Sequence, residues 1–141
     1  MRSTSADQEL ASRLRHAVAR SARRLRQESG TDLSPSLTAA LATIERHVAL
    51  TPSELAVRER VQRPTVTRFV CRLEELGLVT RAADPADRRS ALITITPAGR
   101  ALLATARTRK DAFLSERLEG LSASDRATLE RAAMLLEGML E

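Results

Sequence analysis

Two aromatic side chains, Phe69 and Phe113, and one cysteine, Cys71, are the only residues of these kinds in this chain of 141 residues. The core must therefore be built from leucine, alanine, valine and isoleucine, a mixture that favours helices over sheets. A single cysteine excludes a disulfide within the chain and a cysteine-based zinc site in one chain. The sequence thus predicts one mostly α-helical domain.

The sequence also lacks long apolar runs and the motifs of common catalytic sites. No stretch approaches the roughly 20 residues of a membrane span, and no apolar signal-peptide core begins the chain, so we expect a cytoplasmic protein with no membrane partner. It has no nucleophile motif, no His and Cys cluster, no glycine-rich phosphate loop, and only two histidines. We therefore expect no enzyme activity, no cofactor and no metal site.

Positive charge comes almost entirely from arginine, since 22 arginines and one lysine, Lys110, give a net charge of +5 and a pI near 11. The charge is unevenly placed: residues 1–30 carry +4, residues 31–51 carry −1, residues 52–96 carry +2, and residues 97–141 are neutral. Such a balance indicates a polyanionic partner. An ordinary solvated surface enriched in arginine is the alternative.

Helical periodicity dominates the first third of the chain. Apolar residues recur at helical spacing between about Gln8 and Glu28, and Gly30 follows as a stop signal. Ser34-Pro35 has the form of an N-cap and a first helical residue, so a second helix starts there. The apolar face predicted for this second helix is Leu37, Leu41, Ile44 and Val48.

Two short helices joined by a tight turn are predicted next. Thr51-Pro52-Ser53-Glu54 reads as a capping box, so a third helix begins there and ends near Arg60. After a turn at Val61-Gln62, Pro64 opens a fourth helix, which Gly77 closes. Two such helices form a helix-turn-helix.

Beyond Gly77 the pattern changes from helical to extended and then back. Leu78-Val79-Thr80-Arg81 and Ala91-Leu92-Ile93-Thr94-Ile95 read as two strands around a turn at Asp84-Pro85-Ala86-Asp87, which predicts a hairpin, or wing. Thr96-Pro97 starts a fifth helix that ends near Leu118, and Ser122-Ala123-Ser124-Asp125 starts a sixth that ends near Leu140. The predicted fold is mainly α, with six helices and a small β-hairpin wing.

The fourth helix has an outward face with the chemistry of base recognition. At 100° per residue, the apolar positions cluster on one side and leave five residues on the other: Pro64, Thr67, Arg68, Cys71 and Glu75. Residues 60–73 carry four arginines and no acid. Arginine can fork onto guanine in the major groove, and threonine can reach a base edge, while helix N-terminal amides favour phosphate. A solvated helix face is the alternative.

The predicted wing tip carries Asp87-Arg88-Arg89. A guanidinium on a protruding turn can enter the minor groove, and a nearby carboxylate can hold it ready. A hydrated cluster of loop charges is the alternative.

Cys71 lies on the outward face predicted for the fourth helix, where oxidation of the thiol could act as a switch of DNA binding. A thiol without such a role is the alternative.

Several segments of the chain resemble MarR-type regulators. They are Thr51-Pro52-Ser53-Glu54-Leu55-Ala56, Pro64-Thr65-Val66-Thr67-Arg68, Leu73-Glu74-Glu75-Leu76-Gly77-Leu78-Val79, Asp84-Pro85-Ala86-Asp87-Arg88-Arg89 and Thr94-Ile95-Thr96-Pro97-Ala98-Gly99, of which the wing sequence is the most specific. The resemblance implies an obligate homodimer in which the first and the last two helices dimerise. It also implies DNA contacts from Pro64, Thr65, Thr67 and Arg68, a backbone contact near Arg72, and a minor-groove Arg89 steadied by Asp87.

These observations predict a single MarR-type domain over residues 1–141, with a winged helix-turn-helix lobe at 34–96 and a helical dimerisation region at 6–30 and 97–141. The predicted function is a transcriptional repressor that binds a pseudo-palindromic site on double-stranded DNA as a homodimer. The predicted DNA-binding residues are Arg63, Pro64, Thr65, Thr67, Arg68, Arg72, Asp87, Arg88 and Arg89. The family also implies a small phenolic or carboxylate-bearing effector. A winged-helix protein-interaction module remains the alternative, although arginines in place of apolar anchors argue against it.

Overall fold

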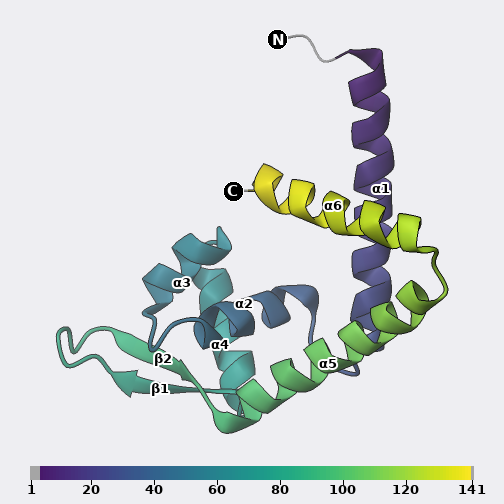
Figure 1. The fold of residues 1–141 in the computed structure, drawn as a ribbon. Helices are drawn as coiled ribbons and strands as arrows, with labels where there is room; N and C mark the ends of the chain where they lie inside the picture. The colour runs from purple at the N-terminus through teal and green to yellow at the C-terminus, as the bar shows by residue number, and fades with distance from the viewer. Residues whose placement is uncertain (1–3, 141) are drawn as a thin grey trace.

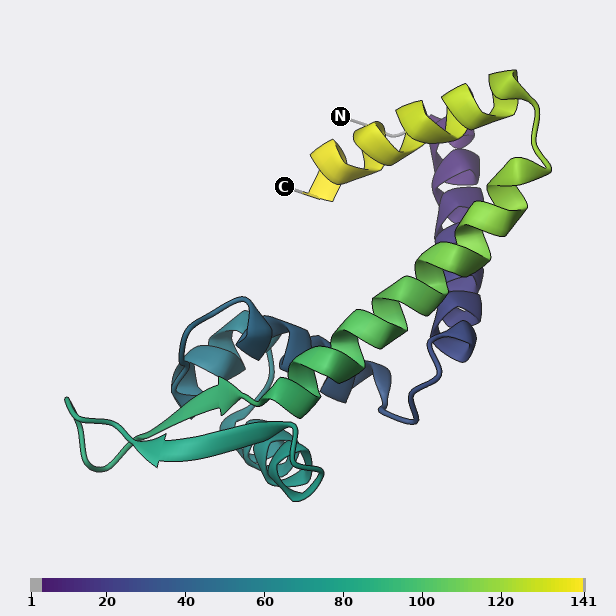
Figure 2. The same ribbon diagram turned by 60° about the horizontal axis from the view of Figure 1, so that its bottom comes forward.

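The computed structural model describes residues 4–140, which form six helices and one antiparallel hairpin. The elements are α1 (Ser5–Glu28), α2 (Pro35–Glu45), α3 (Pro52–Glu59), α4 (Arg63–Glu75), β1 (Val79–Ala83), β2 (Ala91–Ile95), α5 (Pro97–Glu119) and α6 (Ala123–Leu140). We call residues 34–96 the central lobe and α1, α5 and α6 the terminal helices. In Figures 1 and 2 the lobe is a compact group from which α5 leads away toward α1 and α6. The predicted fold class is confirmed.

Capping residues define most helix ends, as the sequence predicts. Ser34, Thr51 and Thr96 each accept a hydrogen bond from the backbone amide three residues on, and a proline follows each of them. Gly77 closes α4 with a φ of 72°, a left-handed conformation in which Gly77 N donates to Glu74 O and Leu78 N donates to Leu73 O, both at 2.9 Å. The chain therefore turns sharply from α4 into β1.

Two boundary predictions need correction. The first helix begins at Ser5, before the predicted Gln8, because Thr4 and Asp7 form a capping box. Val48 is not on the face of the second helix, since α2 ends at Glu45 and Val48 is 96% exposed. The chain leaves the helix there because Leu50 pairs as a β-bridge with a residue of β2.

The hydrophobic core lies inside the central lobe. Its buried side chains come from α2, α3, α4, the hairpin, the segments that join them and the first half of α5: Ala40, Leu41, Ile44, Leu50, Leu55, Ala56, Val66, Val70, Leu73, Leu78, Val79, Ile93 and Leu103. Gly99 lets α5 begin against this core, because a Cβ there would lie within 3.0 Å of Leu78 O and Ile95 Cγ1. The lobe and the start of α5 therefore form one packed body.

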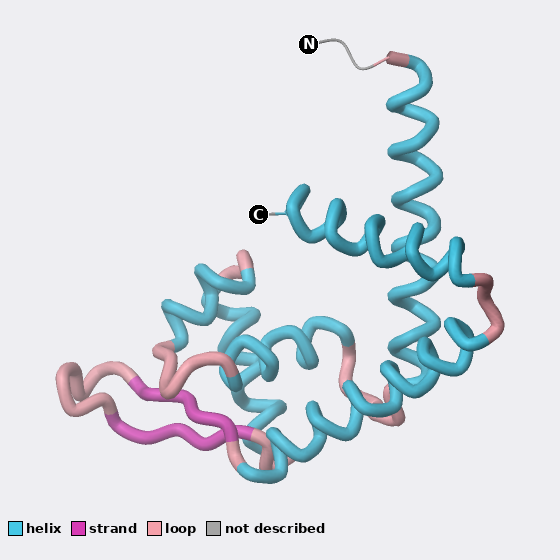
Figure 3. Tube along the Cα trace, in the orientation of Figure 1, coloured by secondary structure: helices cyan, strands magenta, loops and turns pink. Residues whose placement is uncertain are grey.

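The terminal helices bury much less. No residue of α1 or α6 is buried, and Figure 3 shows α6 turning back after α5 without entering the lobe. Large apolar side chains lie open along them, including Leu10, Val18, Leu129, Met134, Leu135, Met139 and Leu140. The chain exposes 10586 Å², against about 7,200 Å² expected for a folded monomer of this mass. Among residues 4–140, no helix is long and apolar enough to cross a membrane.

Candidate nucleic-acid interface

One face of α4 is fixed by the core, and the opposite face is open. Val66, Val70 and Leu73 are buried, so the helix cannot rotate without breaking the lobe. The predicted contact residues Arg63, Pro64, Thr67, Arg68 and Arg72 are all exposed, and Thr65 is half-buried beside them. Cys71, predicted to face outward, is half-buried, and it is a free thiol.

Hydrogen bonds arrange the side chains of this face. Arg63 donates to the Ser53 hydroxyl, which ties the first turn of α4 to α3. Arg68 Nη2 lies 3.4 Å from Thr65 Oγ1, and Arg72 Nη1 lies 3.3 Å from Glu75 Oε2. Of the charged groups described, no carboxylate pairs with Arg63 or Arg68, so these two guanidinium groups stay available to an anion.

The backbone amides at the start of α4 offer less to a phosphate than the sequence predicts. Gln62 caps the helix without a side-chain hydrogen bond, but its carbonyl accepts from the amides of Thr65 and Val66 at 3.0 and 3.1 Å. Pro64 has no amide hydrogen. The arginine side chains, more than the helix N-terminus, therefore supply the positive potential of this surface.

The loop 84–90 at the hairpin tip is ordered by its own polar groups. Asp84 Oδ1 accepts from the Ala86 amide at 2.9 Å, and Asp87 Oδ1 accepts from the Arg89 amide at 3.0 Å. Arg88 and Arg89 are exposed, and no ion pair within residues 4–140 involves either. Asp87 thus holds the backbone of Arg89, while the guanidinium group itself is unpaired.

The predicted site residues form two groups. Those of α4 share one face, whereas Asp87, Arg88 and Arg89 lie at the tip of the hairpin, which extends away from α4 and the terminal helices in Figures 1 and 2. Within residues 4–140, no hydrogen bond or ion pair joins loop 84–90 to α4. A helix face and a separate projecting arginine loop are the two parts that successive grooves of a duplex would accommodate.

Sequence reasoning missed one ion pair that joins the base of the hairpin to α4. Arg81 of β1 forks onto Glu74 of α4, with Nε and Nη2 each 3.0 Å from a carboxylate oxygen. The hydrogen bonds from Arg81 lower the pKa of Glu74 below its usual value, and Glu74 raises the pKa of Arg81. The two residues are seven apart across a helix, a turn and a strand, and no local spacing rule pairs such positions.

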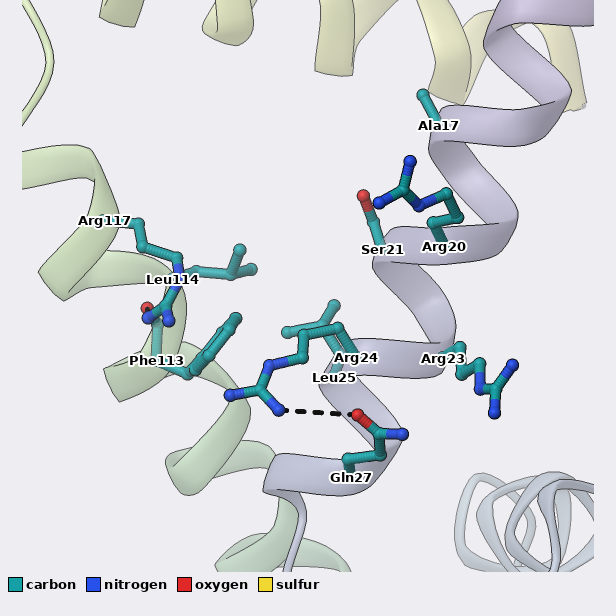
Figure 4. A pocket seen from close by; sticks show the side chains of 10 residues that line it. All are labelled: Ala17, Arg20, Ser21, Arg23, Arg24, Leu25, Gln27, Phe113, Leu114 and Arg117. Carbon is teal, nitrogen blue, oxygen red and sulfur yellow. Dashed lines mark hydrogen bonds between the residues drawn. The ribbon is translucent and has the colours of Figure 1, made fainter.

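Several hollows open among residues 4–140; one lies against α1 and α5, and another adjoins the end of α4. The larger, about 630 Å³, is formed by α1 and α5, where Figure 4 shows Arg24 and Arg117 beside Phe113, while Arg20 and Arg23 lie on α1 and Arg23 points away from the Phe113 ring. Arg117 Cζ lies 3.4 Å and Arg24 Cζ 5.1 Å from the centre of the Phe113 ring. The smaller, about 350 Å³, lies where α4 meets the start of α2 and α5, and its lining includes Asp32, Leu37, Arg72, Leu76 and Leu102.

Known proteins share both the sequence and the fold. Residues 33–91 match the MarR family model. An uncharacterized HTH-type transcriptional regulator of Mycobacterium bovis is 38% identical over 136 residues, which cover 96% of this chain and 95% of the relative. A crystal structure of a Pseudomonas aeruginosa protein has a TM-score of 0.89 and 33% identity, with 99% of each chain covered. Wild-type MarR from Escherichia coli, in its apo form, has a TM-score of 0.73 and 30% identity, with 92% of this chain and 96% of that chain covered.

The central lobe thus combines a helix-turn-helix and a wing, and the likeness to transcriptional regulators extends over almost the whole chain. The chain belongs to the MarR family of helix-turn-helix transcriptional regulators, which bind DNA.

Proposed function

We propose that the protein is a homodimeric repressor that binds a pseudo-palindromic operator through α4 and the wing. In this proposal Arg63, Pro64, Thr65, Thr67 and Arg68 of α4 contact the major groove. Arg72 contacts the DNA backbone, and Arg89, beside Arg88 and the Asp87 turn, enters the minor groove. The observation that carries the proposal is that Arg68 and Arg89 form no ion pair and lie on two separate parts of the central lobe, α4 and the loop at the wing tip.

The proposed dimer interface consists of the terminal helices, residues 6–30 and 97–141, and the proposed DNA-binding lobe is residues 34–96. Apolar side chains that stay open in one chain support this division, since soluble monomers rarely leave such stripes uncovered. The excess surface of roughly 3,400 Å² per chain over a compact monomer exceeds the roughly 1,000 to 2,500 Å² per chain that obligate dimers bury, so it is large enough for such an interface. Two-fold symmetry would then present two α4 helices to two half-sites.

We place the proposed effector in the smaller hollow, beside α4. A volume of about 350 Å³ fits a small phenolic or carboxylate-bearing molecule. Leu37, Leu76 and Leu102 offer apolar contacts and Arg72 offers a positive charge, so an occupant would touch the recognition helix directly. The larger hollow is formed by α1 and α5, which the second chain covers in the proposed dimer.

We assign no catalytic activity, because relatives that match most of the chain are named transcriptional regulators.

The test begins with selection of bound duplexes from a random pool, followed by measurement of affinity against salt. We expect a pseudo-palindromic consensus and an affinity that falls steeply with salt, because several arginines displace counterions. The protein with Arg68→Ala and Arg89→Ala together is the matched control, and it should recover no consensus. A pool without a shared sequence, or an affinity that does not change with salt concentration, would refute the proposed interface.

Sedimentation equilibrium of the free protein tests the proposed dimer. A stable folded monomer at micromolar concentration would refute it.

A further inference from the structure

The wing is held to the helices of the central lobe along one line of residues. Leu50, after α2, exchanges two backbone hydrogen bonds with Ile93 of β2, with N to O distances of 3.1 and 2.7 Å. Ile93 is paired across the hairpin with Arg81 of β1. Arg81 then forks onto Glu74 of α4 through two contacts of 3.0 Å. The hairpin is thus held at one register position, by the backbone pairing of Ile93 with Leu50 and by the Arg81 side chain on Glu74, contacts that we call the clamp.

Beyond this line, toward the tip, little packing holds the wing. Ala82 and Ala83 of β1 are exposed, and Ala91 and Leu92 of β2 are only partly buried. An isolated two-stranded hairpin is marginally stable in water. The angle between the wing and α4 therefore depends on the clamp, in which the Glu74 and Arg81 fork is the side-chain link to α4.

We infer that Glu74 and Arg81 are positioning residues, whose fork holds the wing where Arg89 can enter the minor groove while α4 occupies the major groove. This inference rests on the interface proposed above. Strand residues rise about 3.3 Å each, so the tip lies roughly 13 Å beyond Arg81, and a swing of about 10° at the clamp would move it by about 2 Å. Such a shift breaks a hydrogen bond, whose donor and acceptor lie within about 3.2 Å.

A direct contact between Arg81 and a DNA phosphate is the competing explanation, and it predicts the opposite result. If Arg81 binds phosphate, Glu74 competes for the same guanidinium group, so Glu74→Gln should strengthen binding. If the fork positions the wing, Glu74→Gln should weaken binding, and the loss should require Arg89. The dependence on Arg89 therefore separates the two roles.

The test is a double-mutant cycle of Glu74→Gln with Arg89→Ala, in the full chain, on one fixed duplex from the selected pool at one salt concentration. We expect Glu74→Gln to raise Kd roughly 3- to 10-fold when Arg89 is present and less than about 2-fold when it is absent. Equal changes in both backgrounds, or tighter binding by Glu74→Gln, would overturn the inference.

Glu75→Gln is the matched control, because it removes a neighbouring carboxylate of the same helix that pairs with Arg72 and not with the wing. It carries the same charge change and should show no coupling to Arg89→Ala. The exchange of Glu74→Arg with Arg81→Glu preserves net charge and the ion pair, so it should restore binding that Arg81→Glu alone loses. Failure of this rescue, in a protein whose Tm matches the original chain, would contradict a positioning role.

Hydroxyl-radical footprints add a readout that a purely structural role would not change. Glu74→Gln should lose protection at the outer minor-groove positions and keep it at the centre of each half-site. Unchanged protection at the outer positions would overturn the inference. If the original chain selects no duplex at all, the proposed interface itself fails; if it selects one and the cycle shows no coupling, only the positioning role fails.

Discussion

The central lobe and the terminal helices use the same kinds of side chain with opposite results. Leu41, Leu55 and Leu73 in the lobe are fully buried, whereas Met139 on α6 is 72% exposed. Both regions are helical, and both place apolar residues at helical spacing. The difference shows that the lobe completes its core within one chain, while the terminal helices contain apolar surface for which the same chain provides no cover.

This contrast agrees with the function proposed for each region. Side chains that read DNA must keep a fixed geometry, and α4 obtains it because its inner face is locked into a core. The distance between two copies of α4 would depend on how the terminal helices meet. A region that alters this distance can change DNA binding without any change inside the lobe.

The largest effect should come from a cavity in the lobe. Leu73→Ala removes a fully buried side chain beneath α4, so we expect a loss of about 3 to 5 kcal/mol in the free energy of unfolding. Urea denaturation measures it. Val48→Ala is the control, since a side chain that is 96% exposed should contribute less than about 0.5 kcal/mol. A small loss at Leu73 would mean that the lobe is less tightly packed than its burial indicates.

The next effect tests the terminal helices. Leu129→Glu places a charge on the apolar stripe of α6 formed by Leu129, Leu136 and Leu140. We expect the proposed dimer to dissociate at least about 100-fold more readily, because an unpaired charge in an interface costs several kcal/mol. Ala127→Glu, about 160° around the same helix, adds the same charge at an exposed position, so it is the control and should dimerise nearly normally. Sedimentation equilibrium measures both. If neither or both variants dissociate, the stripe does not form the interface.

Local chemistry explains what the sequence predicted well. Proline after a capping hydroxyl marks the starts of α2, α3 and α5, and Gly77 marks the end of α4, because each feature depends on neighbouring residues alone. The outward placement of Arg68 likewise follows from the helical repeat. The roles of the nine predicted DNA-binding residues stay a prediction; eight of these residues are exposed, and Thr65 is half-buried.

Contacts between distant segments explain what the sequence could not predict. Val48 leaves the helix because Leu50 pairs with Ile93, more than 40 residues later. Glu74 meets Arg81 only because Gly77 turns the chain back toward β1. Cys71 is half-buried, although the periodicity placed it outward, because a helical projection locates a direction and not the neighbours that cover it.

Within the lobe, substitutions on the DNA-binding surface should change affinity without changing stability. Arg68→Ala should cost about 1 to 3 kcal/mol of binding at particular base pairs, whereas Arg89→Ala should weaken binding strongly through the minor groove. Affinities for single-base variants of the selected duplex separate these results. Arg131→Ala, an exposed arginine of α6, is the control and should bind as the original chain does. A uniform loss across sequences from Arg68→Ala would contradict base reading.

A smaller effect concerns strain inside the otherwise well-packed lobe. Arg60 ends α3 in the left-handed conformation, with a φ of 54°, which costs a side chain with a Cβ roughly 1 kcal/mol. Arg60→Gly should therefore raise the free energy of unfolding by up to about 1 kcal/mol. Arg58→Gly, two residues earlier and inside α3, should lower it by a similar amount. Equal signs for the two variants would show that the turn carries no strain.

The smallest effect should be seen at low pH, at the base of the wing. Hydrogen bonds from Arg81 lower the pKa of Glu74, so the fork stabilises the folded state at pH values above the unfolded pKa of about 4.3 and loses this contribution as the pH falls through the lower folded value. The wing should therefore loosen in acid while the buried core of the lobe stays packed. An NMR titration measures this loosening. The amide signals of Thr80 and Arg81 should change at pH values below the usual pKa range of glutamate. In the Arg81→Ala variant the Glu74 carboxyl should titrate near its ordinary pKa, and an unchanged titration there would mean that Arg81 does not hold it.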